Sequence, residues 1–329
     1  MTQGVKHPRA VETRSRVPYN HTVSKAILAL ICAPLLMGGA CEKKSPKAGD
    51  TGAINALDHS GSGGSSGAAI AEGPVDTTPL PGIDTSKLGD KTQTFYKLVG
   101  SLQSPCGKPE SLRVSFTKDT SCKRAPFAVR YVMALVDDEA TEPQVREEYE
   151  KKYKAQAADV HFDVSKAPHE GPEDAPVKLY EFFDYQCPHC KAFKPMLEQV
   201  MKDEAGKVVL YSMMFPLEKH EGSKNASQAG LAAAAQGKFK EMHDLLFEKS
   251  PDHDREHVTE YAKSLGLDMQ KFDTDYNAAA AQVASDIAQG EKAGVDSTPT
   301  LFFNNRKYEG PMHPKYIDMW IDEELAVNR

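Results

Sequence analysis

The feature that most constrains the fold of this 329-residue chain is a cysteine pair, Cys187-Pro-His-Cys190, between two regular patterns. Residues 177–183 (VKLYEFF) alternate and are rich in β-branched and aromatic side chains, which predicts a strand. Residues 191–202 place apolar side chains at helical spacing, which predicts a helix. The chain must therefore supply a strand–turn–helix unit with both thiols at the turn.

This position suits a reactive thiol. The unpaired amides and the dipole at a helix N-terminus stabilise an anion, and the thiolate is the nucleophilic form of cysteine. Cys187 is the expected nucleophile, and His189 is expected to donate to it or to stabilise its charge. Cys190, three residues later, can attack a mixed disulfide and release the substrate.

A metal centre is the competing interpretation of the same residues. A zinc knuckle needs four ligands, whereas this pair supplies two and no second C-x-x-C follows. His253 and His257 have the i, i+4 spacing of a zinc helix, but the metalloprotease glutamate after the first His is missing. His243 is expected to be packed or capping. No metal is predicted, and no glycine-rich phosphate loop indicates a nucleotide cofactor.

The first forty residues have the composition of an export signal. They carry a net charge of +4, and residues 26–40 form a fifteen-residue uncharged run, shorter than the roughly 20 apolar residues that span a bilayer. The run ends in Gly38-Gly-Ala-Cys41, which resembles a bacterial lipobox, although that pattern favours Leu at position 38. The resemblance implies lipidation of Cys41, loss of Cys32 with the signal, and a disulfide-permissive compartment. An ordinary signal peptide with an incidental cysteine is the alternative.

Two segments separate this signal from the cysteine pair. Residues 41–92 contain SGSGGSSG at 60–67 and several prolines, with few large apolar residues, which predicts a flexible linker. Residues 93–156 carry helical patterns and are expected to form a small helical module. Its cysteines, Cys106 and Cys122, are interpreted as a structural disulfide worth about 3 kcal/mol. A redox relay and free or metal-bound thiols are the alternatives.

Two motifs carry a resemblance to a known family. Residues 179–190 (LYEFFDYQCPHC) resemble the active-site segment of the DsbA-like branch of the thioredoxin superfamily, and residues 294–303 (GVDSTPTLFF) resemble its second signature. The resemblance implies that residues 157–329 form a thioredoxin-like α/β domain with a helical insertion between its strands.

The resemblance also implies roles for individual residues. Cys187 would be the exposed attacking thiolate and Cys190 the resolving thiol. Thr298 and a cis Pro299 would bind extended substrate through backbone hydrogen bonds. Glu181 would be a buried acid that assists proton transfer near the resolving cysteine, with a solvent-facing strand carboxylate as the alternative.

The segment before the cysteines contributes further candidates. Tyr185 and its neighbour Gln186 flank the pair and are expected to touch substrate. The Pro-His dipeptide matches DsbA itself, whereas Thr298 departs from the valine of DsbA and is frequent in isomerase and reductase relatives. The direction of electron flow therefore stays open, because it depends on small differences in reduction potential.

The function implied is that of a lipid-anchored, periplasmic thiol–disulfide oxidoreductase that forms, reduces or isomerises disulfides without a diffusible cofactor. Its partners would be exported cysteine-containing proteins and a membrane redox protein that resets the pair. A formal charge of −7 gives no reason to expect nucleic acid as a partner. The alternative from another class is a non-catalytic binding protein or chaperone with the same domain.

Overall fold

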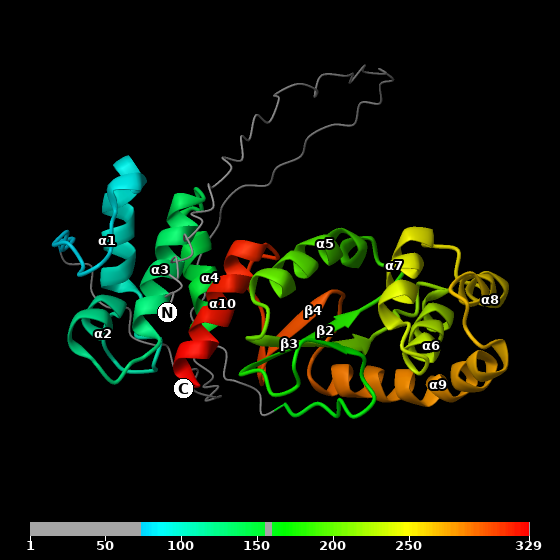
Figure 1. Ribbon diagram of the computed structural model, residues 1–329. Helices are drawn as coiled ribbons and strands as arrows, with labels where there is room; N and C mark the ends of the chain where they lie inside the picture. The colour runs from blue at the N-terminus through cyan, green and yellow to red at the C-terminus, as the bar shows by residue number, and fades with distance from the viewer. Residues whose placement is uncertain (1–73, 155–159, 329) are drawn as a thin grey trace, which may run out of the picture. The chain divides into compact units, whose positions relative to one another are not determined.

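The computed structural model describes residues 74–154 and 160–328, all within the compact unit Ser65–Arg329 (Figure 1). The predicted signal sequence, Cys32, the proposed lipidation site Cys41 and most of the predicted linker lie outside the described residues. Within the described part of the chain, no helix is long and apolar enough to cross a bilayer.

A mixed sheet forms the centre of the C-terminal half. Within the described residues it has five strands in the order β1-β3-β2-β4-β5. Strand β2 pairs in parallel with β3, and the remaining pairings are antiparallel. The strands are β1 (His169–Glu170), β2 (Val177–Phe183), β3 (Val208–Met214), β4 (Thr300–Phe303) and β5 (Arg306–Lys307). The predicted strand at 177–183 is confirmed at both ends.

Helices cover both faces of this sheet (Figure 1). Helices α5 (Pro188–Asp203) and α10 (Pro314–Val327) pack on one face, where Phe193 and Trp320 join the strand residues in one core. The C-terminal end of α9 (Met269–Lys292) packs on the other face, against Phe182 and its neighbours. Strand β2 is buried on both faces because alternate side chains enter the two cores.

A helical insertion separates β3 from β4. It consists of α6 (Ser223–Ala234), α7 (Phe239–Lys249), α8 (Arg255–Ser264) and α9. Most of the small side chains of α6 are buried and let the helix pack closely on its neighbours. This core extends to Phe183 at the end of β2. The predicted α/β fold with a helical insertion is confirmed, and the insertion lies beside the turn that carries the cysteine pair.

The segment before the sheet is helical. Its elements are the 3-10 helix η1 (Ser86–Lys91), α1 (Thr92–Ser101), α2 (Leu112–Lys118), α3 (Ala125–Asp137) and α4 (Glu142–Lys154). A disulfide joins Cys106, before α2, to Cys122, after it, with a Cα–Cα distance of 5.9 Å. The bond therefore closes a loop around α2, between helices that share one core.

The N-terminal edge of this module differs from the expected boundary at residue 93. Leu80 and Leu88 are buried in the module core, and Val75 and Ile83 pack against it. Residues 80–91 are thus part of the module and not of a flexible linker. The few apolar residues of this stretch are spaced so that the module core can bury them.

Buried ion pairs join the helical module to α10. The Glu323 carboxylate is fully buried and pairs with Arg124, and its Oε2 atom lies 3.0 Å from the Lys152 Nζ atom. The Lys152 ammonium also lies 3.7 Å from the centre of the Trp320 ring. Burial lowers the pKa of Lys152 to about 7, although Glu323 opposes this effect. The contact between the helical module and α10 thus encloses opposite charges that compensate one another.

Candidate active site

The cysteine pair begins helix α5. Cys187 occupies the N-cap in an extended conformation, Pro188 is the first helical residue, and Cys190 follows in the first turn. Both are free thiols. Cys190 is fully buried, and Cys187 is only 5% exposed, which corrects the expectation of an exposed thiol. The reason is that Cys187 belongs to the core shared with the insertion, which approaches the turn from one side.

A second segment covers the Cys187 thiol. The Thr298–Pro299 peptide bond is cis, and the Cys187 Sγ atom donates to the Thr298 carbonyl oxygen at 3.3 Å. Strand β4 begins directly afterwards and pairs antiparallel with β2. The Thr298 hydroxyl is buried without a hydrogen-bond partner among the described residues. The fold thus brings two motifs, more than a hundred residues apart in the sequence, to the same sulfur atom.

Glu181 lies in the middle of β2, beneath the cysteine turn. Its strand neighbours are Ser212 on β3 and Leu301 on β4, and only 6% of its surface is exposed. Burial raises the pKa of Glu181 to about 8, while Lys194 acts weakly in the opposite direction. Burial raises the pKa of the Cys190 thiol, and the negative charge of ionised Glu181 raises it further by a smaller amount. The carboxyl group is therefore a buried acid and not a solvent-facing one.

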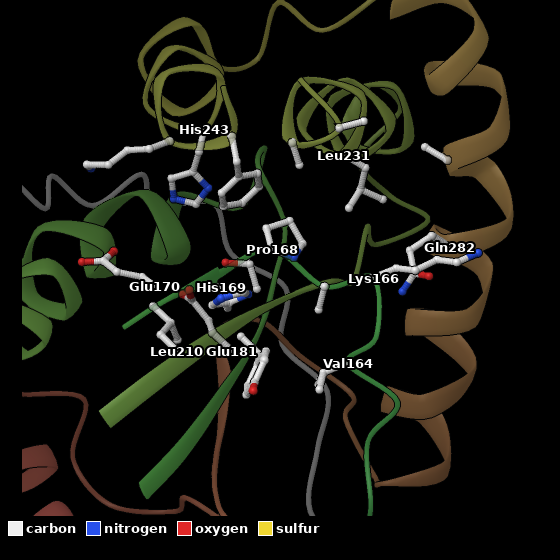
Figure 2. A pocket seen from close by; sticks show the side chains of 18 of the residues that line it. Val164, Lys166, Pro168, His169, Glu170, Glu181, Leu210, Leu231, His243 and Gln282 are labelled. Carbon is white, nitrogen blue, oxygen red and sulfur yellow. The ribbon is translucent and has the colours of Figure 1, made fainter. Parts of the chain in front are cut away.

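A large pocket leads to this acid (Figure 2). Its volume is about 1200 Å³, and it lies between the sheet and the helical insertion. Glu181 lines it from β2 and His243 from α7, while Leu231 on α6 and Gln282 on α9 complete other parts of the wall. The carboxyl group of Glu181 therefore borders a cavity that is large enough to hold water.

His189 does not occupy the position expected from the sequence. Its side chain is exposed, and among the described residues it makes no hydrogen bond or ion pair. The Cys187 thiol donates to the Thr298 carbonyl group and not to this imidazole. Residues two apart do not share a face of a helix, which explains why His189 does not contact Cys187 although the two are close in the sequence.

Tyr185, a predicted substrate contact, lies in the core beside the cysteine turn. Tyr185 is fully buried, and its hydroxyl oxygen lies 3.2 Å from the Nδ1 atom of His243. Its ring packs on Phe183 and Phe247. The His243 ring packs against Phe183 and Phe247, as the sequence predicted, and burial lowers the pKa of His243 to about 3. The insertion covers Tyr185, and no short-range pattern before the cysteines indicates that cover.

The histidine pair with zinc-helix spacing does not converge on one site. His253 lies before α8, is buried, and its Nε2 atom is 2.8 Å from the Leu246 carbonyl oxygen. His257 lies within α8, and its Nδ1 atom is 2.7 Å from an Asp254 carboxylate oxygen. Among the described residues, no cluster of three or more His, Cys, Asp or Glu side chains could hold a metal ion.

Sequence reasoning assigned no role to Asp184. This residue ends the strand segment three positions before Cys187, and its side chain is fully buried. The Gln186 side chain is also held by two hydrogen bonds. Its Nε2 atom donates to the Pro251 carbonyl oxygen at 2.6 Å, and its Oε1 atom accepts from the Gly222 amide at 3.1 Å. A carboxylate directly after an apolar strand is the one sequence signal that could have identified Asp184.

Residues 163–323 match the model of a protein family described as thioredoxin. Among curated proteins, the Na(+)/H(+) antiporter NhaA 1 of Mycobacterium sp. (strain KMS) is 36% identical over 146 residues, which cover 43% of this chain and 24% of that protein. NhaA 3 of Salinispora tropica is 32% identical over 161 residues, covering 48% and 25%. The chain thus spans about a quarter of the length of these relatives.

Solved structures give similar matches. A thioredoxin-like oxidoreductase from Silicibacter pomeroyi DSS-3 is 28% identical, with 48% of this chain and 91% of that chain covered and a TM-score of 0.44. Oxidised BdbD from Bacillus subtilis is 27% identical, with 50% and 96% covered and a TM-score of 0.45. The matched part of the present chain holds the cysteine pair, Glu181 and the cis proline.

Proposed function

We propose that residues 163–323, which match the thioredoxin family model, act as a DsbA-like domain that exchanges disulfides with exported proteins through Cys187 and Cys190. The family match supports a general oxidoreductase role. The observation that carries the specific proposal is the position of the Cys187 thiol, at the N-cap of α5 and 3.3 Å from the carbonyl oxygen before Pro299. Helix amides stabilise the thiolate, and the neighbouring backbone offers a hydrogen-bonding edge.

In the reductive direction, the Cys187 thiolate attacks one sulfur atom of a substrate disulfide. A Cys187–substrate bond forms, the substrate disulfide breaks, and the leaving thiolate takes a proton. The Cys190 thiolate then attacks the Cys187 sulfur, which forms the Cys187–Cys190 disulfide and releases the substrate as a dithiol. The oxidative direction reverses these steps, and a membrane redox partner resets the pair. Electrons pass only between the Cys187–Cys190 pair and the sulfur atoms of the substrate or of the redox partner, so the proposal requires no diffusible cofactor.

Glu181 fits the role of proton acceptor for Cys190. The Cys190 thiol is buried and its pKa is raised, so it needs a base before it can attack. The pKa of Glu181, about 8, keeps this carboxyl group able to give and take a proton near neutral pH. The pocket beside it supplies a solvent route. Thr298 and Pro299 are proposed to hold the extended substrate chain beside Cys187.

The experiment compares the protein with its Cys187→Ser and Cys190→Ala variants in two assays, reduction of insulin and oxidation of reduced ribonuclease. We expect both assays to lose activity in Cys187→Ser, and Cys190→Ala to accumulate mixed disulfides. Cys106→Ser/Cys122→Ser serves as the matched control, because it removes the other cysteine pair. Equal activity in wild type and Cys187→Ser would reject the enzyme and favour the binding or chaperone alternative.

The reduction potential of the pair decides the direction of electron flow. On the scale of known proteins, a value of about −120 mV indicates an oxidase and about −270 mV a reductase. Equilibration with glutathione buffers, followed by alkylation and mass measurement, gives this value directly. A value of about −180 mV, as in protein disulfide isomerase, favours isomerisation.

The proposed site of action is the periplasm, with the protein anchored by a lipid on Cys41. The basic start, the short apolar run and the Gly-Gly-Ala-Cys41 sequence support this proposal. Metabolic labelling with palmitate is expected to mark the wild type and to fail in Cys41→Ser. Label that persists in Cys41→Ser would refute the anchor.

A further inference from the structure

Asp184 lies in the turn that carries Cys187. Its buried carboxylate accepts hydrogen bonds from the segment after β3 and from the turn itself. The Oδ2 atom accepts from the Leu217 amide at 2.8 Å and lies 2.8 Å from the His220 Nδ1 atom. The Oδ1 atom accepts from the Ser223 hydroxyl group, and from the Gln186 amide at 2.7 Å. Asp184 itself is 0% exposed, so these contacts replace its hydration completely.

These donors connect the turn to the start of the helical insertion. Leu217 and His220 lie in the loop after β3, and Ser223 is the first residue of α6. On the turn itself, the Asp184 carbonyl oxygen accepts from the Cys187 amide at 3.1 Å. One buried residue thus binds the insertion through its side chain and the Cys187 backbone through its carbonyl group. Buried networks of this kind fix geometry because every member depends on the others.

We infer that Asp184 is a positioning residue that holds the Cys187 turn in its dithiol geometry and thereby makes the pair a stronger oxidant. The inference rests on the proposed function and deepens it. In the dithiol form, the hydrogen bond to the Thr298 carbonyl group restrains the Cys187 sulfur, and the Asp184 contacts restrain the backbone that carries it. In the disulfide form, a covalent bond to Cys190 restrains the same sulfur. Loss of the Asp184 contacts therefore destabilises the dithiol more than the disulfide.

The test measures the equilibrium constant for reduction of the Cys187–Cys190 disulfide by glutathione, using the full chain. In Asp184→Asn, the side-chain NH₂ group faces hydrogen-bond donors that were bonded to a carboxylate oxygen. We therefore expect this constant to fall about tenfold. For a two-electron couple, a tenfold change is about 30 mV, toward more negative potentials. Ser223→Ala removes one of the donors and is expected to lower the constant about threefold. The measurement does not require a protein substrate, so it is independent of the activity assays that test the proposed function.

Asp286→Asn is the matched control. Asp286 is also a fully buried acidic residue that joins the insertion to the sheet, since it accepts from the Met214 amide at 3.0 Å. Among the described residues it makes no hydrogen bond to the cysteine turn. A purely structural role predicts that both asparagine variants lower the stability of dithiol and disulfide equally and leave the constant unchanged. An Asp184→Asn constant within twofold of wild type would overturn the inference. If that variant does not fold, an unchanged constant in Ser223→Ala overturns it instead.

Discussion

Replacement of Glu181 by glutamine should remove a strong pH dependence from the stability of this protein. Burial raises the pKa of Glu181 from 4.5 to about 8. Between these two values the folded protein holds the proton, and the unfolded chain has lost it. Stability contributed by the neutral carboxyl group is complete below pH 4.5 and falls as the pH rises toward 8. The slope is about 1.4 kcal/mol per pH unit, which gives a loss of about 3 kcal/mol between pH 5 and pH 7.5.

The assay is urea unfolding at several pH values, followed by the fluorescence of Trp320, which is the single tryptophan of the chain and is buried beside the sheet. The wild type and Glu181→Gln are compared in a Cys187→Ser background, in which the Cys187–Cys190 disulfide cannot form. No reductant is then needed, and the Cys106–Cys122 disulfide stays intact. Glutamine keeps the shape of the side chain and cannot titrate. The difference in unfolding free energy, wild type minus Glu181→Gln, should therefore fall as the pH rises.

Other groups that titrate in this range are present in both proteins and cancel in the difference. Burial raises the pKa of Asp286 to about 7 and that of Asp318 to about 6. Glu198→Gln provides the control, because the ion pair with Lys194 and its other partners lower the pKa of Glu198 despite partial burial. This variant should keep the wild-type pH dependence between pH 5 and pH 7.5. A difference for Glu181→Gln that is constant or rises with pH would refute the assignment of a buried, neutral acid.

Three further outcomes follow from the structure. Tyr185→Phe removes the contact with His243 and should lower the unfolding free energy by about 1 kcal/mol. Disulfide exchange should stay unchanged, and a loss of exchange would support the predicted contact of Tyr185 with substrate. Cys106→Ser/Cys122→Ser should cost about 3 kcal/mol in thermal or urea unfolding, and unchanged insulin reduction would exclude a relay. Glu323→Ala leaves buried cations uncompensated and should cost about 3–5 kcal/mol in urea unfolding, whereas a neutral effect would contradict the ion-pair assignment.

Local patterns predicted the reactive turn well and its surroundings poorly. Strand β2 and the start of α5 follow from alternation, helical spacing and the position of Pro188, all of which act within a few residues. The burial of Cys187 and Tyr185 depends on the insertion and on the Thr298–Pro299 segment, which arrive from distant parts of the chain. The same limit applies to the edge of the helical module, where burial of Leu80 depends on helices that follow it.

The sequence by itself determined which atoms are available for chemistry: two thiols at a helix start, a carboxyl group in the preceding strand, and a Thr-Pro motif far downstream. These are properties of short segments, and residue type and spacing are sufficient to specify them. Only the tertiary structure decided what surrounds the atoms. It buried Glu181 so that its pKa rises to about 8, moved His189 to the surface, and enclosed Asp184 among donors from the insertion. The physical reason is that desolvation and hydrogen bonding depend on neighbours in space, and those neighbours come from segments separated by tens to hundreds of residues.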